Sequence, residues 1–312
     1  MDRIWLKSYP EGVAHDIHPE QYSSLTDVLE RAFRDHANNP FSVCMDRWMS
    51  YRDLDQHSAA LGAWLQAQGL EPGSRVAIML PNLPQFAVTM AAVIRAGYTC
   101  VNVNPLYTAR ELEHQLKDSG ASAIVILENF AHTLQEVIEH SQVKHVVLTS
   151  LGDMLGPFYG RWMTFAVRHL AKLVPEFELP LSNGRRVTTW RQALGQGRNQ
   201  TLKPTPQTMD DIAFLQYTGG TTGLSKGAIL THRNIVAAML QAEAWFQPAL
   251  ASVGDLRKVN SIAALPLYHI FALTLCLLAI RQGSHLTLIP NPRDFGKFIE
   301  VLKKRPFHML PG

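Results

Sequence analysis

Strand signals and helix signals alternate between Arg75 and Thr149, and this alternation restricts the fold more than any other feature of the sequence. The chain has four short apolar runs typical of buried strands, at residues 76–80, 99–103, 123–127 and 145–149. Helices are expected between them, at residues 85–96, after a capping sequence at 108–111, and at 133–141. Strands that alternate with helices over short connections predict an α/β fold, with a parallel sheet that has helices on both faces.

The segments on either side of this alternation carry separate signals. Ser50 and Asp53 have the spacing of a capping box, which predicts a helix that ends near Gly69. The apolar face of this helix consists of Leu54, Ala60, Leu61, Trp64 and Leu65. Residues 203–206 are typical of a linker into a second unit. In that unit we expect strands at residues 212–217, 227–230, 261–265 and 285–289, and a helix capped by Thr231 at 234–246.

The composition excludes several classes of protein. With 46% hydrophobic and 18% charged residues, the chain is neither disordered nor fibrous, and a net charge of +3 is too small to indicate a nucleic-acid partner. The cysteines, Cys44, Cys100 and Cys276, form no CxxC pair, which argues against zinc sites and disulfides and fits a reducing compartment. The amino terminus lacks a signal-peptide core, and the apolar run at residues 270–280 is shorter than the ~20 residues that cross a bilayer. We therefore expect no integral membrane segment.

Residues 161–174 are a candidate amphipathic helix inside a stretch, residues 151–209, that interrupts the alternating pattern. Its apolar positions are Trp162, Phe165, Ala166, His169 and Leu173. Its basic positions, Arg161, Arg168 and Lys172, lie largely on another face. One interpretation is a patch that rests on anionic lipid. The alternative is a surface helix that packs on its own protein, since basic amphipathic helices of this kind are common.

A glycine-rich segment between two predicted strands is the strongest chemical signal. It consists of Tyr217, Thr218, Gly219, Gly220, Thr221, Thr222, Gly223, Leu224, Ser225, Lys226 and Gly227. Glycines let backbone N–H groups converge on an anion, hydroxyls add donors or a metal ligand, and a lysine supplies positive charge. The segment differs from a Walker A loop because Ser225 precedes the lysine, Gly227 follows it, and extended structure comes before any helix. The length of the pattern favours a polyphosphate site over a flexible turn.

The segment resembles the signature phosphate loop of the adenylate-forming superfamily, which includes acyl-CoA synthetases, adenylation domains and luciferases. Other stretches are similar to bacterial long-chain fatty-acid–CoA ligases, namely residues 101–121, 230–234, 264–273 and 291–294. The resemblance implies the large-domain fold of that superfamily, with layered sheets and helices on both faces, over an incomplete amino-terminal adenylation domain at residues 1–312. It implies a first doubly wound lobe at roughly 70–205, and part of a second lobe at roughly 15–65 with 210–312.

The resemblance also implies a two-step reaction. A fatty carboxylate attacks the α-phosphate of ATP to give acyl-AMP and pyrophosphate, and the CoA thiolate then displaces AMP to form a thioester. Charge crowding opposes the first step, and Mg²⁺ with convergent donors relieves it. The implied substrates are a long-chain fatty acid, ATP and CoA. A homodimer and a cytoplasmic location, peripheral on the inner face of a membrane, are further expectations.

By resemblance, individual residues receive roles. Thr218 is the expected magnesium ligand, Gly219 to Gly223 surround the β- and γ-phosphates, and Lys226 lies beside them as a catalytic residue. His269 is expected beside the adenylate and the mouth of the acyl pocket, and Leu273 at the gate of the acyl tunnel. From the residues alone, a lone histidine such as His269 is more often a hydrogen-bonded core residue. The apolar run that follows it suits either a buried helix or a tunnel wall.

The family extends beyond the position of Gly312, with motifs for adenine and ribose and a small carboxy-terminal domain that carries a catalytic lysine. Residues 1–312 alone are therefore expected to form no acyl-AMP, and the last five residues are expected to form a buried strand. Two alternatives remain open. One is another adenylate-forming ligase, for a medium-chain, aryl or amino acid, and the other is a non-catalytic fragment that binds nucleotide or lipid.

Overall fold

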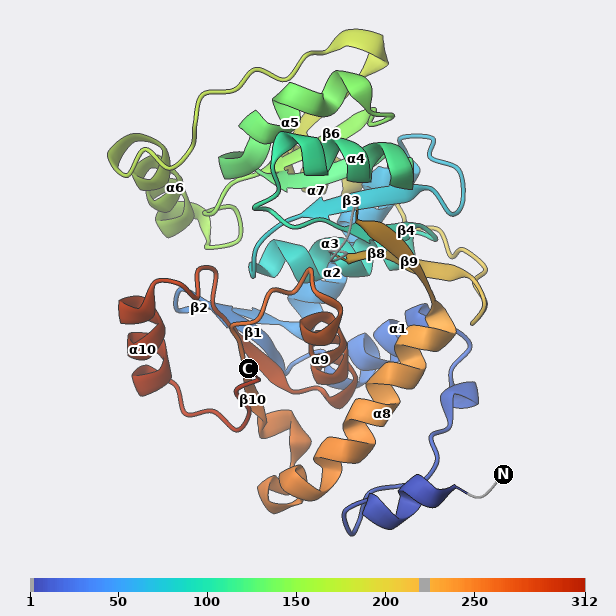
Figure 1. Ribbon diagram of the computed structural model, residues 1–312. Helices are drawn as coiled ribbons and strands as arrows, with labels where there is room; N and C mark the ends of the chain where they lie inside the picture. Colours follow the sequence, from blue (N-terminus) through green and yellow to red (C-terminus); the bar gives the residue numbers. More distant parts are fainter. Residues whose placement is uncertain (1–2, 219–224, 312) are drawn as a thin grey trace.

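The computed structural model describes residues 3–218 and 225–311, whose strands form two sheets (Figure 1). The larger sheet has seven strands in the order β7-β6-β5-β3-β4-β8-β9, all parallel except for the antiparallel pair β8 and β9. Their bounds are β3 (Arg75–Met79), β4 (Thr99–Asn102), β5 (Ala123–Leu127), β6 (His145–Thr149), β7 (Arg186–Thr189), β8 (Ile212–Thr218) and β9 (Lys226–Thr231). The α/β class and the four strands expected between Arg75 and Thr149 are confirmed.

Helices cover both faces of this sheet, as the alternating pattern predicts. The helices are α2 (Tyr51–Gln66), α3 (Pro84–Arg95) and α7 (Trp190–Gly197) on one face, and α4 (Ala109–Ser119) and α5 (Ala131–Val137) on the other. Alternate strand residues divide between these layers: Ile78 packs in the same cluster as Phe86 of α3, and Ala77 in the same cluster as Leu112 of α4. A strand buried on both faces reads as a continuous apolar run, which explains why the sequence signal is strong here.

The smaller sheet has four strands in the order β10-β11-β1-β2. Its elements are β1 (Pro40–Cys44), β2 (Arg47–Ser50), β10 (Asn260–Ala263) and β11 (His285–Leu288). It packs with α1 (Leu25–His36), α8 (His232–Leu250) and α9 (Ile270–Gln282), whereas α10 (Phe295–Lys304) has no buried residue. Figure 1 shows α2 and α3 in the layer between the two sheets, so one continuous apolar cluster joins both halves. Short 3-10 turns occur at Ile4–Ser8, Pro19–Gln21, Glu128–Phe130, Ile138–His140, Ser182–Gly184, Ala251–Val253 and Leu256–Lys258.

Capping residues set several helix starts where the sequence predicts them. The side chain of Ser50 accepts a hydrogen bond from the Asp53 N–H, and the Asp53 carboxylate accepts one from the Ser50 N–H. The same reciprocal pair begins α4 at Thr108 and α8 at Thr231. Each pair satisfies two backbone N–H groups that would otherwise lack a partner in the first helical turn.

Some expectations differ from the structure. The strands β8 and β9, from the region expected in the second lobe, extend the larger sheet because the edge of β4 is open for pairing, with Cys100 opposite Phe214. The irregular stretch 151–209 contains β7 and α7, which the sequence analysis missed. The buried strand expected at the last five residues is wrong for residues 308–311. Met309 forms a single bridge with Ser261, and Leu310 is 46% exposed because no described element covers it.

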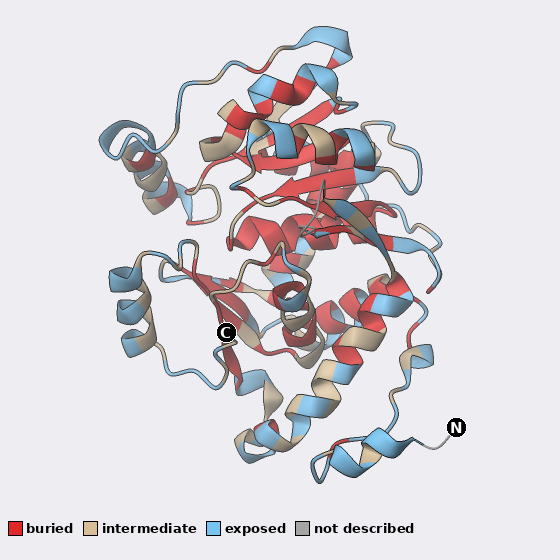
Figure 2. Ribbon diagram, in the orientation of Figure 1, coloured by how far each residue is buried: buried red, intermediate tan, exposed pale blue. Residues whose placement is uncertain are grey.

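The candidate amphipathic helix begins earlier than expected, as α6 (Pro157–Phe165), and continues as a π-helical turn at Ala166–Leu170. Figure 2 shows that α6 has both exposed and buried parts. Of the expected apolar positions, Trp162 is 58% exposed, Phe165 53%, and Leu173, which lies beyond the end of the helix, 61%. The helix packs on its own protein through the buried residues Gly160 and Val167, as the second alternative expects, but with a face other than the expected apolar one. No described helix has the length and apolar character to cross a membrane.

Close packing of α7 on α2 gives a test of the fold. A Cβ at Gly197 would lie 1.9 Å from the carbonyl oxygen of Ala60 on α2, whereas a Cβ at Gly195 would meet no heavy atom within 4 Å. We expect Gly197→Ala to lower the free energy of unfolding by about 1–3 kcal/mol. The matched control Gly195→Ala is expected to raise it by about 0.5–1 kcal/mol, because alanine loses less backbone entropy than glycine in a helix. Denaturant unfolding of both variants measures the difference, and equal stabilities would contradict this packing.

Candidate active site

The carboxyl ends of β3, β4 and β8 lie side by side at one edge of the larger sheet. The strand order reverses here, because β4 lies on one side of β3 and β5 on the other. In open α/β sheets, ligands bind in the crevice outside such a reversal. The glycine-rich segment follows β8 directly, so it starts at the same carboxyl edge of the sheet, with β4 between β8 and the reversal at β3 and β5.

The β8–β9 hairpin holds the two ends of that segment. Thr218 at the end of β8 pairs with Lys226 at the start of β9, and both are exposed. A hydroxyl and an ammonium group therefore come from directly opposite positions at the base of the segment. The other expected phosphate-binding residues lie outside the described residues, namely Gly219, Gly220, Thr221, Thr222, Gly223 and Leu224.

Tyr217 belongs to the same segment but is turned into the protein. Its side chain is buried, and its hydroxyl donates a hydrogen bond of 2.6 Å to the Asp118 carboxylate. Burial, and then the neighbouring Asp118 carboxylate, raise the pKa of the Tyr217 hydroxyl well above its usual value. The hydroxyl therefore stays protonated at neutral pH and remains a donor.

His269 lies on the loop that leads into α9 and is exposed. It caps α9, with its Nδ1 accepting from the Phe271 N–H at 3.5 Å. The preceding residue, Tyr268, accepts a hydrogen bond of 3.0 Å through its carbonyl from the Gln216 side chain on β8. The structure thus joins the loop of His269 to the strand that carries Thr218, although 50 positions separate the two residues in the numbering.

Asn82 fastens the same loop from the larger sheet. It follows β3 and is 4% exposed, and its Nδ2 donates hydrogen bonds of 2.9 Å to the carbonyls of Ala263 and Leu265. Its Oδ1 accepts a hydrogen bond of 2.8 Å from the Leu267 N–H. The amide nitrogen and the amide oxygen of Asn82 thus both bond to backbone groups of this loop. Asn82 is therefore a positioning residue.

Sequence reasoning assigned no role to Asn82 or Gln216. The available signal was weak: one lone amide, Asn82, follows β3, and another, Gln216, lies within β8. Buried amides at such positions need partners, and an amide that satisfies the backbone of a distant loop cannot be recognised from local spacing.

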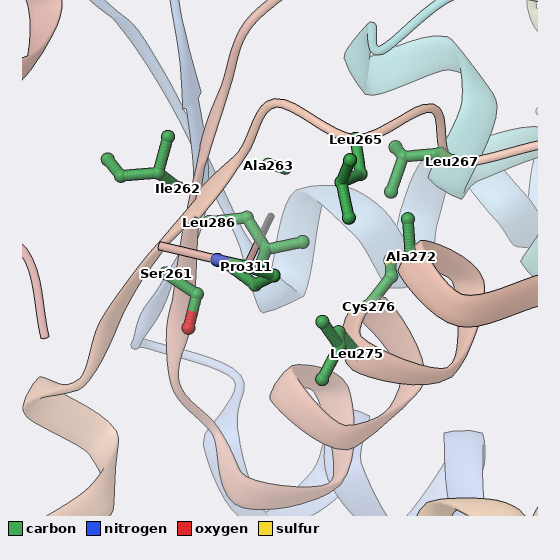
Figure 3. Close-up of a pocket in the computed structure, with 10 residues that line it drawn as sticks. All are labelled: Ser261, Ile262, Ala263, Leu265, Leu267, Ala272, Leu275, Cys276, Leu286 and Pro311. Carbon is green, nitrogen blue, oxygen red and sulfur yellow. The ribbon is translucent and has the colours of Figure 1, made fainter. Parts of the chain in front are cut away.

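The apolar run after His269 forms the largely buried helix α9, although Phe271 is exposed, and its role as a tunnel wall stays a prediction. An apolar cavity of about 20 Å³ lies between α9, β10 and β11 (Figure 3). It is lined by residues that include Leu265, Ala272 and Cys276, and Pro311 lies against it. A volume of this size holds about one water molecule, so an acyl chain enters here only if side chains move. Leu273 is fully buried on α9 and is not among the lining residues.

Two basic side chains matter for the charge near this loop, Lys226 at the start of β9 and Arg293 after β11. Lys226 and Arg293 are exposed, and the Arg293 charge lies close enough to oppose the rise in the pKa of Tyr268 that burial causes. Within residues 3–218 and 225–311, no group of three or more His, Cys, Asp or Glu side chains could hold a metal ion. The positive charges of Lys226 and Arg293 favour anions at this edge of the sheet.

Comparison with known proteins gives a consistent result. A long-chain-fatty-acid–CoA ligase from Escherichia coli O157:H7 is 47% identical over the whole chain, and one from Haemophilus influenzae strain Rd is 43% identical. A ligase with the same description from Bacillus subtilis strain 168 is 32% identical over 99% of the chain. The chain spans about half the length of these curated relatives, 54%, 55% and 53% respectively.

Solved structures share the fold at low sequence identity. A long-chain-fatty-acid–CoA ligase from Archaeoglobus fulgidus has a TM-score of 0.71 at 20% identity, with 95% of this chain and 52% of that chain covered. An anthranilate CoA ligase in complex with anthranoyl-AMP has a TM-score of 0.72 at 18% identity, with 92% and 50% covered. These matches confirm the expected large-domain fold. Residues 29–312 also match the AMP-binding enzyme family, and we conclude that the chain belongs to this family.

Proposed function

We propose that the protein that contains this chain activates long-chain fatty acids with ATP and transfers the acyl group to CoA. The observation that carries the proposal is the 47% identity to a long-chain-fatty-acid–CoA ligase over the full 312 residues, including the glycine-rich segment. The start of this segment at the carboxyl edge of the larger sheet, with exposed Thr218 and Lys226 at its base, supports the phosphate-binding part of the proposal. Because the chain spans about half the length of this relative, the activity is proposed for the complete protein.

In the first step, a carboxylate oxygen bonds to the α-phosphorus of ATP, and the bond from that phosphorus to pyrophosphate breaks. Lys226 and the backbone of the glycine-rich segment hold the leaving phosphates and stabilise the charge that develops on them. In the second step, the CoA thiolate bonds to the acyl carbon and the carbon–oxygen bond to AMP breaks. His269, on a loop fastened by Asn82 and Gln216, is the proposed contact of the adenylate. Leu273 on α9 is the proposed gate of the acyl site.

Thr218 is the proposed protein ligand for Mg²⁺. Its hydroxyl is a hard oxygen donor, it is exposed at the end of β8, and it lies opposite Lys226 in the hairpin. Phosphate oxygens of bound ATP would supply further oxygen ligands, which Mg²⁺ prefers. When bound, the ion neutralises phosphate charge during the attack. We propose no further metal ligand from this chain.

ATP–pyrophosphate exchange by the complete protein tests this function. With a panel of carboxylic acids, we expect exchange to depend on long-chain fatty acids and to be weak with benzoate or amino acids. Strict preference for an aryl acid or an amino acid would move the protein to another ligase of the family. Tight nucleotide or fatty-acid binding without any exchange would support a non-catalytic binding protein instead.

The exposed face of α6 supports a second part of the proposal, contact with the cytoplasmic face of an anionic membrane. Phe158 is 87% exposed, and it lies at helical spacing from the exposed Trp162 and Phe165. The basic residue Arg161 is on the same helix, and Lys172 is exposed two residues after the π-helical turn. Aromatic rings favour the headgroup region of a bilayer, and basic side chains are attracted to anionic lipid. Arg168 has a different role, because it pairs with the buried Glu128 carboxylate.

Vesicle flotation tests the membrane contact. In the complete protein, Arg161→Gln, Lys172→Gln and Trp162→Ala together are expected to reduce binding to vesicles of phosphatidylglycerol and phosphatidylcholine by at least about tenfold, at ~1 kcal/mol for each basic residue. Arg168 stays unchanged, because its loss would leave Glu128 buried without its cation. The control is Phe295→Ala with Lys303→Gln on α10, which is expected to float like the parent protein. Equal flotation of the α6 variant would remove this helix from the proposal.

A further inference from the structure

Helix α4 contacts both flanks of the glycine-rich segment, through His114 on one side and Asp118 on the other. On the side of β9, the Nε2 of His114 lies 2.8 Å from the carbonyl oxygen of Ser225. A carbonyl can only accept, so the His114 ring donates its Nε2–H to Ser225. Ser225 directly precedes Lys226, the residue proposed to hold the phosphates.

On the side of β8, Asp118 accepts the hydrogen bond from the Tyr217 hydroxyl. His114 and Asp118 are four residues apart on α4, so their side chains lie one helical turn apart on the same face. One face of α4 therefore bonds to Tyr217, which precedes Thr218, and to Ser225, which precedes Lys226. The two ends of the segment are connected to a single rigid element.

Among the described strands, β9 pairs only with β8. It is the last strand of the larger sheet in the described residues, and none of its residues is buried (Figure 2). Edge strands with few buried contacts open at low free-energy cost. The ring of Tyr217 packs closely under the hairpin, since a Cβ at Gly227 would lie 3.0 Å from it. The hydrogen bond from His114 reaches Ser225, the residue next to Lys226.

We propose that His114 is a positioning residue for nucleotide binding, which acts by holding the Ser225 carbonyl and thereby the Lys226 side chain in place for the phosphates. The inference rests on the proposed function of the glycine-rich segment. His114 touches no substrate in this scheme. Its effect is on preorganisation: a lysine on an edge strand loses conformational freedom before ATP arrives, which lowers the cost of binding.

The test uses the complete enzyme with His114→Ala. We expect the KM for ATP, and the Kd of a non-hydrolysable ATP analogue measured without fatty acid, to rise about five- to tenfold through the loss of one hydrogen bond. The KM for fatty acid and the thermal midpoint are expected to stay close to those of the parent enzyme. His114→Gln keeps a side-chain N–H donor and is expected to recover most of the affinity. His140→Ala is the matched control, because His140 is exposed and bonds to the Glu113 carboxylate of α4, whereas His114 bonds to the Ser225 carbonyl.

Two results would overturn the inference. An unchanged KM for ATP in His114→Ala would show that the contact does not position the lysine. A parallel rise in both KM values with a lower thermal midpoint, not recovered by glutamine, would show that the histidine only supports the fold. A parent enzyme without any ATP-dependent activation of carboxylic acids would instead refute the proposed function, so the two failures are distinguishable.

Discussion

Lys226→Ala in the complete enzyme is expected to lower kcat/KM for ATP by about a hundred- to a thousandfold. The side chain is exposed and opposite Thr218 at the base of the glycine-rich segment, so its loss removes a positive charge from the phosphates and leaves the core intact. Charged donors that stabilise a developing negative charge have effects of this size in other active sites. The free energy of unfolding is expected to change by less than about 0.5 kcal/mol, since exposed residues rarely support folding.

Steady-state kinetics with variable ATP measures this effect, with two matched variants. Lys226→Arg keeps the charge and is expected to retain more activity than alanine, although its planar guanidinium does not reproduce a point charge. Lys203→Ala, at another exposed lysine in the segment before β8, is expected to behave like the parent enzyme. Normal ATP dependence in Lys226→Ala would show that this lysine does not serve the phosphates.

Asn82→Leu is expected to lower the free energy of unfolding by about 3 kcal/mol, and to reduce ligase activity in the fraction that stays folded. The substitution preserves the approximate volume of the side chain but removes hydrogen bonds to Ala263, Leu265 and Leu267. Each buried backbone group that loses its partner lowers the free energy of unfolding by about 1–3 kcal/mol. The loss is smaller where the group keeps a second hydrogen bond. Activity should fall because the loop released by this change carries His269.

Urea unfolding of the complete protein compares Asn82→Leu with Asn199→Leu. Asn199 is exposed and makes a single bond of 3.3 Å to the Gly195 carbonyl, so its replacement is expected to change stability by less than about 0.5 kcal/mol. If both variants have the same stability, the contacts of Asn82 contribute nothing to holding the loop. A stable but inactive Asn82→Leu would show that the contacts serve the site alone.

The parts of the fold that the sequence predicts are those set by local chemistry. Capping boxes at Ser50, Thr108 and Thr231 begin helices where their spacing indicates, because each satisfies its own first turn. The hairpin of β1 and β2 could not be found in this way. Its turn places Met45 and Asp46 at φ values of 48° and 61°, in the left-handed region that glycine and asparagine normally mark. Packing of the smaller sheet overrides that local preference.

The candidate site also has a part that the sequence predicts and a part that it does not. The glycine-rich segment is contiguous in the chain, so its residue types predict phosphate binding from the sequence alone. The contacts that arrange the site join positions far apart in the chain, such as Asn82 with Leu267 and His114 with Ser225. Such pairs become neighbours only when the order of strands is known, and no local spacing reveals them.

The most direct measurement of the central claim follows an oxygen label through the reaction. The complete protein is supplied with palmitate labelled with ¹⁸O in its carboxylate, together with ATP, Mg²⁺ and CoA, and the products are analysed by mass spectrometry. If the carboxylate attacks the α-phosphorus and CoA then displaces AMP, one labelled oxygen appears in AMP, none in pyrophosphate, and palmitoyl-CoA forms in equal amount. Label in inorganic phosphate with formation of ADP, or no acyl-CoA at all, would contradict the account.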